Sequence, residues 1–243
     1  MKILWTIATK EFLGYFRTYT AYVVAAVYLL LSFAATFYIA YFFEYNNRNL
    51  ISFFMYQPIV LNLILPALTM KMWAEERRQG TLEFLLTQPV SYGQLICGKF
   101  LAAVLFCFVL LGLLIPFVLY ISTFIELDKL NVIASFLGAF LIMVMLCALG
   151  CLVSSLNSNT ILAYLSTLFC GWMVESLNFN FLLKPVKDVF PLLSGDLNGI
   201  LNFNTHYQQI ILGQIGISNI GYFILLSVGL LWLNKFTIQH SKK

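Results

Sequence analysis

The sequence predicts an all-α membrane protein with six transmembrane helices, an N-terminal interfacial amphipathic helix and a short cytoplasmic helix. Of its 243 residues, 61% are hydrophobic and only 10% are charged, and the mean hydropathy is +0.88. Such a composition is typical of a chain that is embedded in lipid. The apolar runs are continuous and do not alternate with a period of two, which favours membrane-spanning helices over barrel strands.

The first expected element is an amphipathic helix over residues 2–19. Its apolar side chains recur at helical spacing, and its basic side chains lie on the other side. We expect such a helix to lie along the inner leaflet with its apolar face in the lipid. The apolar members are Trp5, Ala8, Phe12, Tyr15, Phe16 and Tyr19, and the polar members are Lys2, Thr6, Lys10 and Arg17.

Six apolar runs follow, and a helix needs roughly 20 apolar residues to cross the hydrocarbon core. We place the spans at about residues 20–43, 50–72, 93–124, 131–153, 160–177 and 212–234. The polar sequence SSLNSN at residues 154–159 predicts a short turn between the fourth and fifth spans. The first span lacks the features of a cleavable signal peptide, so we expect it to remain in the chain.

Two of these spans contain residues that disturb a helix. Pro58 and Pro66 fall in the second span, and Gly112 with Pro116 falls in the third. Proline lacks the backbone N–H that a helix requires, so we expect kinks at these positions.

The distribution of Lys and Arg predicts that both termini are cytoplasmic. With the N-terminus inside, ten Lys and Arg residues are cytoplasmic and four are outside, as the positive-inside rule requires. The acidic residues divide the other way, four inside and six outside. The net charge of +4 therefore reflects topology and does not indicate nucleic-acid binding. Residues 178–209 form an outer segment, which we expect to lie on the outer leaflet or to dip into it.

A polar segment at residues 73–91, WAEERRQGTLEFLLTQPVS, separates the second span from the third. Its first part continues helically from the second span. Arg77 and Arg78 complement the negative end of that helix dipole, and Gly80 predicts the point where the helix stops.

The second part of this segment predicts another short helix. Thr81 is expected to cap it and Pro89 to end it. Ser91 and Gln94 then form a capping box that opens the third span. The short helix LEFLLT has more apolar surface than a simple linker needs, so we expect it to insert into a partner surface.

Several chemistries are excluded by what the sequence lacks. No Walker A, HExxH or GxSxG pattern occurs. No acidic or basic side chain lies well inside a span, with Glu175 close to the outer end of the fifth, so no ion-coupling relay is expected. The cysteines are expected to pack as small apolar residues, although Cys147 and Cys151 leave a metal pair open. Energy for transport would have to come from a partner.

Residues 65–103 resemble the permease subunit of type 2 ABC (ABC-2) transporters, most of all the gliding-motility-associated branch. That family's pattern is E-(K/R)-x-x-G-T-L-E-x-L-L-x-x-P-(V/L)-S, followed by G-K-F or A-K-F. The end of the chain, GQIGISNIGYFILLSVGLLWLN, also resembles the family, but Ser218 and Asn219 stand where members often carry an acidic residue. The pattern is matched by Glu76, Arg77, Gly80, Thr81, Leu82, Glu83, Leu85, Leu86, Pro89, Val90, Ser91, Gly98, Lys99 and Phe100.

The resemblance implies that residues 1–243 form a single transmembrane permease domain of an exporter in the bacterial inner membrane. Its partners would be a separate ABC ATP-binding subunit, a second permease copy or paralogue, and membrane lipids. ATP and Mg²⁺ would be bound by the ATP-binding subunit, so we expect no enzyme activity, cofactor or metal in this chain. In the family, the loop between the second and third spans contains the coupling helix that docks on the ATPase. The implied coupling residues are Glu75, Glu76, Arg77, Arg78, Gly80, Thr81, Leu82, Glu83 and Pro89.

Two alternatives stay open at this point. Residues 73–91 could be an ordinary solvated loop in which the EERR sequence only obeys the positive-inside rule. The whole chain could also be a membrane anchor or scaffold that recruits a cytosolic ABC ATPase for mechanical or signalling work without transport.

Overall fold

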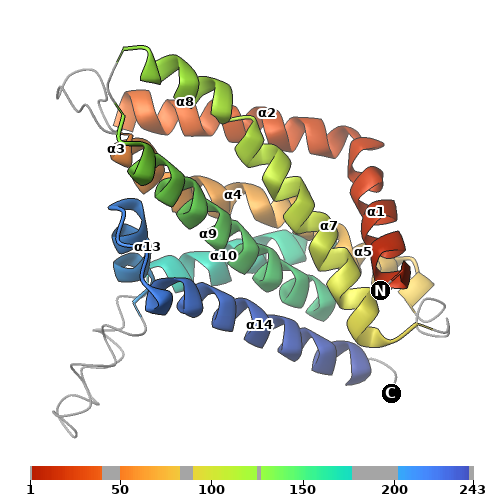
Figure 1. Cartoon of the computed structure of the whole chain (residues 1–243). Coiled ribbons are helices and arrows are strands. Elements are labelled where there is room, and N and C mark those ends of the chain that lie inside the picture. Colours follow the sequence, from red (N-terminus) through yellow and green to blue (C-terminus); the bar gives the residue numbers. More distant parts are fainter. Residues whose placement is uncertain (1, 40–49, 83–89, 125–126, 177–201, 241–243) are drawn as a thin grey trace, which may run out of the picture.

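The computed structural model is a bundle of helices. Within the residues that it describes, no strand occurs, which agrees with the predicted all-α class. The start of α1 (Lys2–Phe16) and the end of α14 (Ile217–His240) lie at the same end of the bundle, close to α5 (Lys71–Arg78), and α13 (Phe203–Ile211) lies at the opposite end (Figure 1). The described residues are 2–39, 50–82, 90–124, 127–176 and 202–240.

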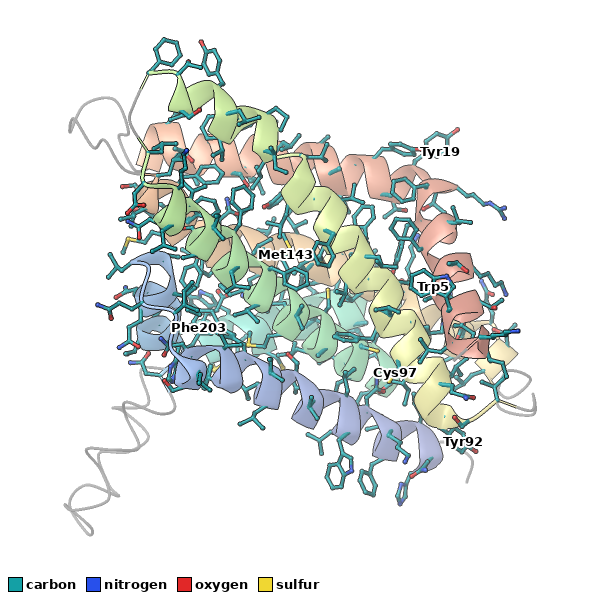
Figure 2. All side chains as sticks on the ribbon, viewed as in Figure 1. Trp5, Tyr19, Tyr92, Cys97, Met143 and Phe203 are labelled. Atoms are coloured by element: carbon teal, nitrogen blue, oxygen red, sulfur yellow. The ribbon has the colours of Figure 1, made fainter. Side chains whose placement is uncertain are left out.

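Four helices in the described ranges are long and apolar enough to cross a membrane. They match the first, third, fourth and sixth predicted spans. Many apolar side chains of the first and the last of these four helices point away from the bundle, as contact with lipid requires (Figure 2). The four are α2 (Tyr19–Ala34) with the π-helical turn η1 (Ala35–Ile39), α7 (Tyr92–Gly112) with α8 (Ile115–Ser122), α9 (Lys129–Leu156) and α14 (Ile217–His240).

The second and fifth predicted spans correspond to shorter helices. The second contains α3 (Ile51–Met55) and α4 (Gln57–Thr69), and the fifth is α10 (Thr160–Ser176). Because Pro58 has no N–H, the Phe54 carbonyl loses its helical donor, and the Tyr207 hydroxyl of α13 donates to it. The second predicted span is therefore broken near its first residues, between α3 and α4. The six-span count stays a prediction.

The third predicted span is also broken where the sequence indicates. α7 ends at Gly112, and α8 begins at Ile115 with Pro116 in its first turn. Proline is favoured in that position because its missing N–H has no helical partner there. Pro66, by contrast, lies inside α4 without ending it.

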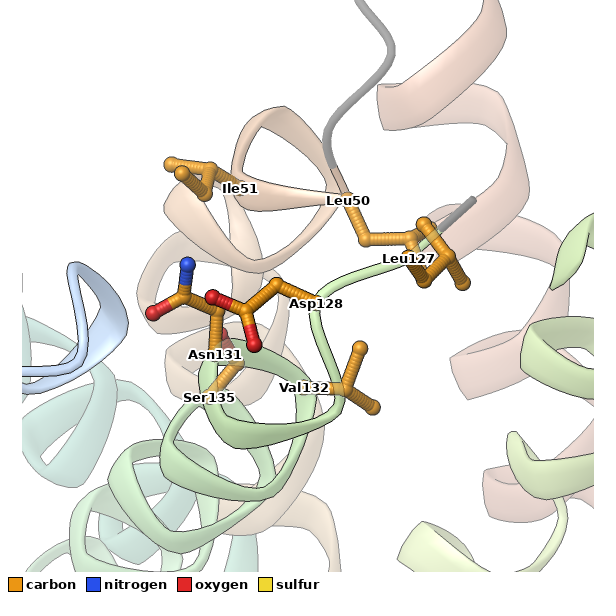
Figure 3. A pocket seen from close by; sticks show the side chains of 7 residues that line it. All are labelled: Leu50, Ile51, Leu127, Asp128, Asn131, Val132 and Ser135. Carbon is orange, nitrogen blue, oxygen red and sulfur yellow. The ribbon is translucent and has the colours of Figure 1, made fainter. Parts of the chain in front are cut away.

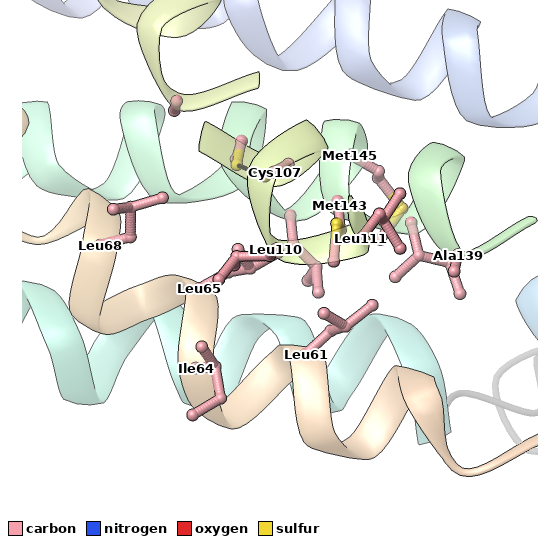
Figure 4. Packing of buried hydrophobic residues seen from close by; sticks show 14 of the residues in the cluster. Leu61, Ile64, Leu65, Leu68, Cys107, Leu110, Leu111, Ala139, Met143 and Met145 are labelled. Carbon is pink, nitrogen blue, oxygen red and sulfur yellow. Dashed lines mark hydrogen bonds between the residues drawn. The ribbon is translucent and has the colours of Figure 1, made fainter. Parts of the chain in front are cut away.

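The centre of the bundle is α9, which packs against α4, α7, α10 and α14. Its apolar side chains interlock with those of α4 and α7 (Figure 4). Since lipid tails are as apolar as the core, this close packing supplies much of the helix association. The core includes Leu61, Ile64, Leu65 and Leu68 of α4, Cys107, Leu110 and Leu111 of α7, and Ala139, Met143 and Met145 of α9.

A glycine allows α4 and α9 to approach each other closely. A Cβ atom added to Gly150 would lie 2.1 Å from Oγ1 of Thr69 and 2.7 Å from its Cβ. Small residues at helix contacts are typical of membrane bundles, because they let backbones approach.

Some helix ends differ from the predicted boundaries. The expected turn at residues 154–159 is shorter, because α9 continues to Leu156 and α10 begins at Thr160. The last helix begins at Ile217 and not near residue 212, because Gly213 ends α13 with a φ of +84°. Within the predicted outer segment, residues 178–201 lie outside the described residues.

The predicted N-terminal helix is α1 (Lys2–Phe16), and its packed face contains four of the six predicted apolar members, namely Ala8, Phe12, Tyr15 and Phe16. It packs against α7 with Ile7, Ala8 and Tyr15 turned inward. Trp5 and Tyr19, assigned to the apolar face, are exposed (Figure 2). Packing against α7 therefore determines which side of α1 faces the bundle.

A small pocket lies at the start of α9, at the end of the bundle opposite α5 (Figure 3). Asp128 caps α9 there by accepting a hydrogen bond from the Leu130 N–H at 3.0 Å. Asn131 and Ser135 line the same pocket, whose volume of about 20 Å³ is enough for one water molecule. This site therefore closes a helix end and has no room for a larger ligand.

Candidate coupling site

The predicted coupling segment begins with α5, which ends where the sequence indicates. After Arg78 and Gln79, Gly80 takes a φ of +69°, a left-handed conformation that favours glycine. The Thr81 hydroxyl donates to the Glu76 carbonyl at 3.2 Å, which closes the helix end. The predicted stop at Gly80 is confirmed.

The first turn of α5 is held by a side chain of α9. The Ser154 hydroxyl accepts hydrogen bonds from the N–H groups of Trp73 and Ala74, each at 3.1 Å. It also donates to the Met70 carbonyl at 3.0 Å, at the break between α4 and α5. One hydroxyl therefore supplies a cap that no side chain of α5 provides.

Replacing Ser154 by alanine is expected to lower the free energy of unfolding by about 1 to 2 kcal/mol, because two buried N–H groups lose their acceptor. Thermal unfolding of the purified chain, followed by circular dichroism, measures the change. Ser158, which is exposed in the turn after α9, provides the matched control. Equal stability of the Ser154→Ala and Ser158→Ala chains would contradict the capping role.

Trp73 fixes the same turn of α5 from another side. Its side chain is 1% exposed, and its Nε1 donates to the Cys151 sulfur at 3.2 Å. Asn234 of α14 donates to the same sulfur at 3.0 Å. Cys151 therefore links α5 to α14 through α9 and packs as part of this contact.

A charged cluster joins α5 to α1 and α7. Lys99 of α7 is 3% exposed, and its Nζ lies 2.7 Å from Glu76 Oε1 and 3.2 Å from Glu11 Oε1. The ammonium also lies 5.2 Å from the centroid of the Trp73 ring, within range of a cation–π attraction. We call Glu11, Glu76 and Lys99 the charged junction.

The charged junction is stable only while its members are paired. Removing an ion from water is costly, and pairing with hydrogen bonds offsets that cost. Burial raises the pKa of the Glu76 carboxyl above its usual range, and the Lys99 ammonium opposes this shift. The loss of Lys99 would therefore leave a carboxyl in an environment that disfavours its charge.

The glycine before Lys99 makes this arrangement possible. A Cβ added to Gly98 would lie 2.7 Å from Cγ2 of Ile7 and 2.9 Å from its Cβ, both on α1. The next residue, Phe100, packs on the apolar core. Within the sequence GKF, Gly98 thus lets α1 approach α7, and Lys99 pairs with the Glu11 carboxylate of α1. Phe100 anchors α7 on the apolar core.

The remaining predicted coupling residues divide by exposure. Glu75 lies 3.9 Å from Arg78 across one turn of α5, and Arg78 is largely exposed. Gly80 and Thr81 are exposed, whereas Leu82 is buried. Arg77 is intermediate, and Glu83 and Pro89 lie outside the described residues.

The predicted capping box at the start of α7 is confirmed. The Ser91 hydroxyl accepts from the Gln94 N–H at 3.3 Å, and the Gln94 side chain accepts from the Ser91 N–H at 3.2 Å. This reciprocal pair fixes the point where the chain re-enters the bundle.

A cavity of about 460 Å³ lies beside the charged junction, between α1, α2, α4 and α5. Glu11, Glu76 and Lys99 line part of it. The cavity explains why the two carboxylates are partly exposed while the ammonium between them is buried. Its other polar side chains are Thr18, Thr20, Lys71, Glu75 and Gln79.

Three residues of this site are absent from the predicted set. Glu11 and Ser154 lie in other parts of the chain, and Lys99 entered only as a match to the family pattern. A signal for the charged junction was nevertheless present, since Lys99 is followed by a long apolar run and needs an acidic partner.

Residues 5–170 match the family model described as "ABC-2 family transporter protein". The match covers more than half of the chain and includes the three helices that meet at the charged junction. A search of curated proteins found no match. With its several apolar helices, the chain is a multi-pass membrane protein that belongs to the ABC-2 family, as a membrane permease component of an ABC transporter.

Proposed function

We propose that this chain is the membrane-spanning subunit of an ATP-driven exporter, coupled through residues 73–91 to a separate ATP-binding subunit. ABC-2 permeases work with an ABC ATP-binding partner in general. ATP and Mg²⁺ would bind in that partner, and a second permease copy or paralogue would complete the transporter. In this proposal the chain lies in the bacterial inner membrane with six spans and cytoplasmic termini, and belongs to the gliding-motility-associated branch.

The observation that carries the proposal is the attachment of α5 to several helices at once. Lys99 ties it to α1 and α7, and Ser154 and Cys151 tie it to α9. A force on the exposed end of α5 would therefore move these helices together, as a rigid body. A solvated linker would need none of these buried contacts.

The same contacts suggest separate roles for the predicted coupling residues. Arg78, Gly80 and Thr81 are exposed and therefore available to a partner. Glu76 is turned toward Lys99, so we assign it to transmission within the chain. The start of α1 and the end of α14 lie at the same end of the bundle as α5, which supports a common cytoplasmic side (Figure 1).

A pull-down of the tagged chain from its native host tests the docking surface. With the unaltered chain, we expect a soluble ATPase with Walker motifs to co-purify. Arg78→Glu is expected to reduce its recovery several-fold, because a reversed charge opposes a complementary surface. Lys235→Glu, a charge reversal at an exposed position of α14, is the matched control and should recover the ATPase fully.

Absence of any ATPase from the unaltered sample would refute the proposed partnership. Equal losses with Arg78→Glu and Lys235→Glu would show that net charge, and not the end of α5, governs association. Recovery with all three chains would place the docking surface elsewhere.

A further inference from the structure

Two polar side chains meet between α4 and α10, away from the charged junction. Asn62 is 4% exposed and Glu175 is 8% exposed. The Asn62 Nδ2 group donates to Glu175 Oε2 at 3.4 Å. The pair therefore links α4 to α10, and both of its side chains are almost completely buried inside the protein.

The other oxygen of the carboxyl group and the oxygen of the amide have no hydrogen-bond donor among the described residues. These atoms are Glu175 Oε1 and Asn62 Oδ1, and both are buried. Two acceptors cannot satisfy each other, and a buried acceptor without a donor is costly. A proton on Glu175 Oε1 would turn it into a donor for the amide oxygen. The two groups would then form an acid–amide pair with two hydrogen bonds.

The described helices around Glu175 offer no cation to balance a carboxylate. α10 packs against α4, α5, α9 and α13. α4 has no Asp, Glu, Lys or Arg, and the single such residue of α9, Lys129, is exposed at the first position of that helix, whereas Glu175 is buried. The charged residues of α5 lie at the other end of the bundle from α13 (Figure 1).

The polar side chains that α13 places near Glu175 are also neutral or already hydrogen-bonded to other groups. The Asn204 amide donates to the Glu175 backbone carbonyl at 3.2 Å. The nearby Tyr207 hydroxyl donates to the Phe54 carbonyl, and His206 is paired with Asn219. Among the described residues, an ionised Glu175 carboxylate would thus face apolar and neutral groups, an arrangement that membrane interiors strongly disfavour.

A glycine makes room for the amide of this pair. Gly171 lies one helical turn before Glu175, on the same face of α10. A Cβ added to Gly171 would lie 2.2 Å from Asn62 Oδ1 and 3.2 Å from its Nδ2. The Asn62 side chain therefore rests directly on the backbone of α10, and its position is set by packing.

We propose that Asn62, Gly171 and Glu175 form an intramembrane proton-binding site in which Glu175 is a neutral carboxylic acid. The ligand is a proton on Oε1, shared with the Asn62 amide oxygen. Release of the proton would place a negative charge beside an acceptor and weaken the contact between α4 and α10. The site changes the sequence-based expectation, because Glu175 had been set aside as lying near a span end.

Thermal unfolding of the purified full chain in lipid nanodiscs tests this site across a range of pH. The folded chain would keep a proton that an unfolded, solvated carboxyl releases, so the site stabilises at low pH and loses this effect as pH rises. The wild-type melting temperature should therefore fall toward alkaline pH more steeply than that of Glu175→Gln, whose side chain stays neutral. At acidic pH the two chains should melt within a few degrees of each other.

Two results of this experiment would overturn the proposal. A Glu175→Gln chain that melts well below the wild type at every pH would mean that the carboxyl is ionised and paired. A wild-type melting temperature that rises with added sodium chloride, but not with choline chloride, would mean that the site takes a metal cation.

Infrared spectroscopy of the same preparations identifies the proton directly. The wild type should show a protonated-carboxyl C=O band that is absent from Glu175→Gln. Gly171→Ala should shift this band, because the added methyl displaces the Asn62 amide. Gly229→Ala, where an added Cβ meets nothing within 4 Å, is the matched control and should leave it unchanged. A wild-type spectrum without the band, or a band equally present in Glu175→Gln, would refute the assignment.

Discussion

A Lys99→Met chain is expected to be less stable than the wild type by about 3 kcal/mol, the low end of the cost of breaking a buried ion pair. The buried ammonium is shared by Glu11 and Glu76, so its loss leaves two carboxylates facing each other without a cation. The low end applies because both carboxylates reach the neighbouring cavity. The loss would also remove the ion pairs that link α7 to α1 and α5.

Chemical denaturation of the purified chain, followed by circular dichroism, measures this effect. Lys235→Met removes an exposed lysine at the same end of the bundle and should change stability by no more than about 0.5 kcal/mol. A chain that combines Lys99→Met with Glu11→Gln and Glu76→Gln removes the uncompensated charges and should recover most of the loss. If Lys99→Met behaved like Lys235→Met, the charged junction would have no structural role.

The second large effect is expected at the contact between α4 and α9. Gly150→Ala should lower the free energy of unfolding by about 2 kcal/mol, within the range for overpacked cores. The added methyl would overlap both Oγ1 and Cβ of Thr69, so rotation of the threonine side chain cannot relieve the clash. The helices would have to move apart.

Gly221→Ala provides the comparison for this prediction. It lies in α14, and an added Cβ meets nothing within 4 Å. Alanine is favoured over glycine in helices by up to about 1 kcal/mol, so this change should be neutral or stabilising. The same denaturation experiment serves both chains, and equal effects would contradict the close approach of α4 and α9.

The features that the sequence predicted correctly depend on neighbouring residues. The Ser91 and Gln94 capping box, the helix stop at Gly80 and the break at Pro116 each involve fewer than five positions. Such signals operate before any tertiary contact forms, because caps and prolines act on the local backbone. The apolar runs located the long helices for the same reason.

The features that the sequence did not reveal depend on distant residues. Lys99 is 88 positions from Glu11, and Asn62 is 113 positions from Glu175. No local pattern pairs them. On α1, packing against α7 buries Ala8 and leaves Trp5 exposed, although the sequence assigned both to one apolar face. Burial of a polar group is visible only when the helix that covers it is known.

The setting of Trp73 gives α5 an optical signal of its own. The chain has four tryptophans, and the other three, Trp5, Trp172 and Trp232, are each more than half exposed. The Trp73 indole alone combines deep burial with a cysteine sulfur at 3.2 Å and a lysine ammonium at 5.2 Å. Sulfur quenches indole fluorescence and a nearby charge shifts its emission. A tilt of α5 would therefore change the emission wavelength and fluorescence lifetime of this one tryptophan, so that any motion of α5 can be followed without an added dye.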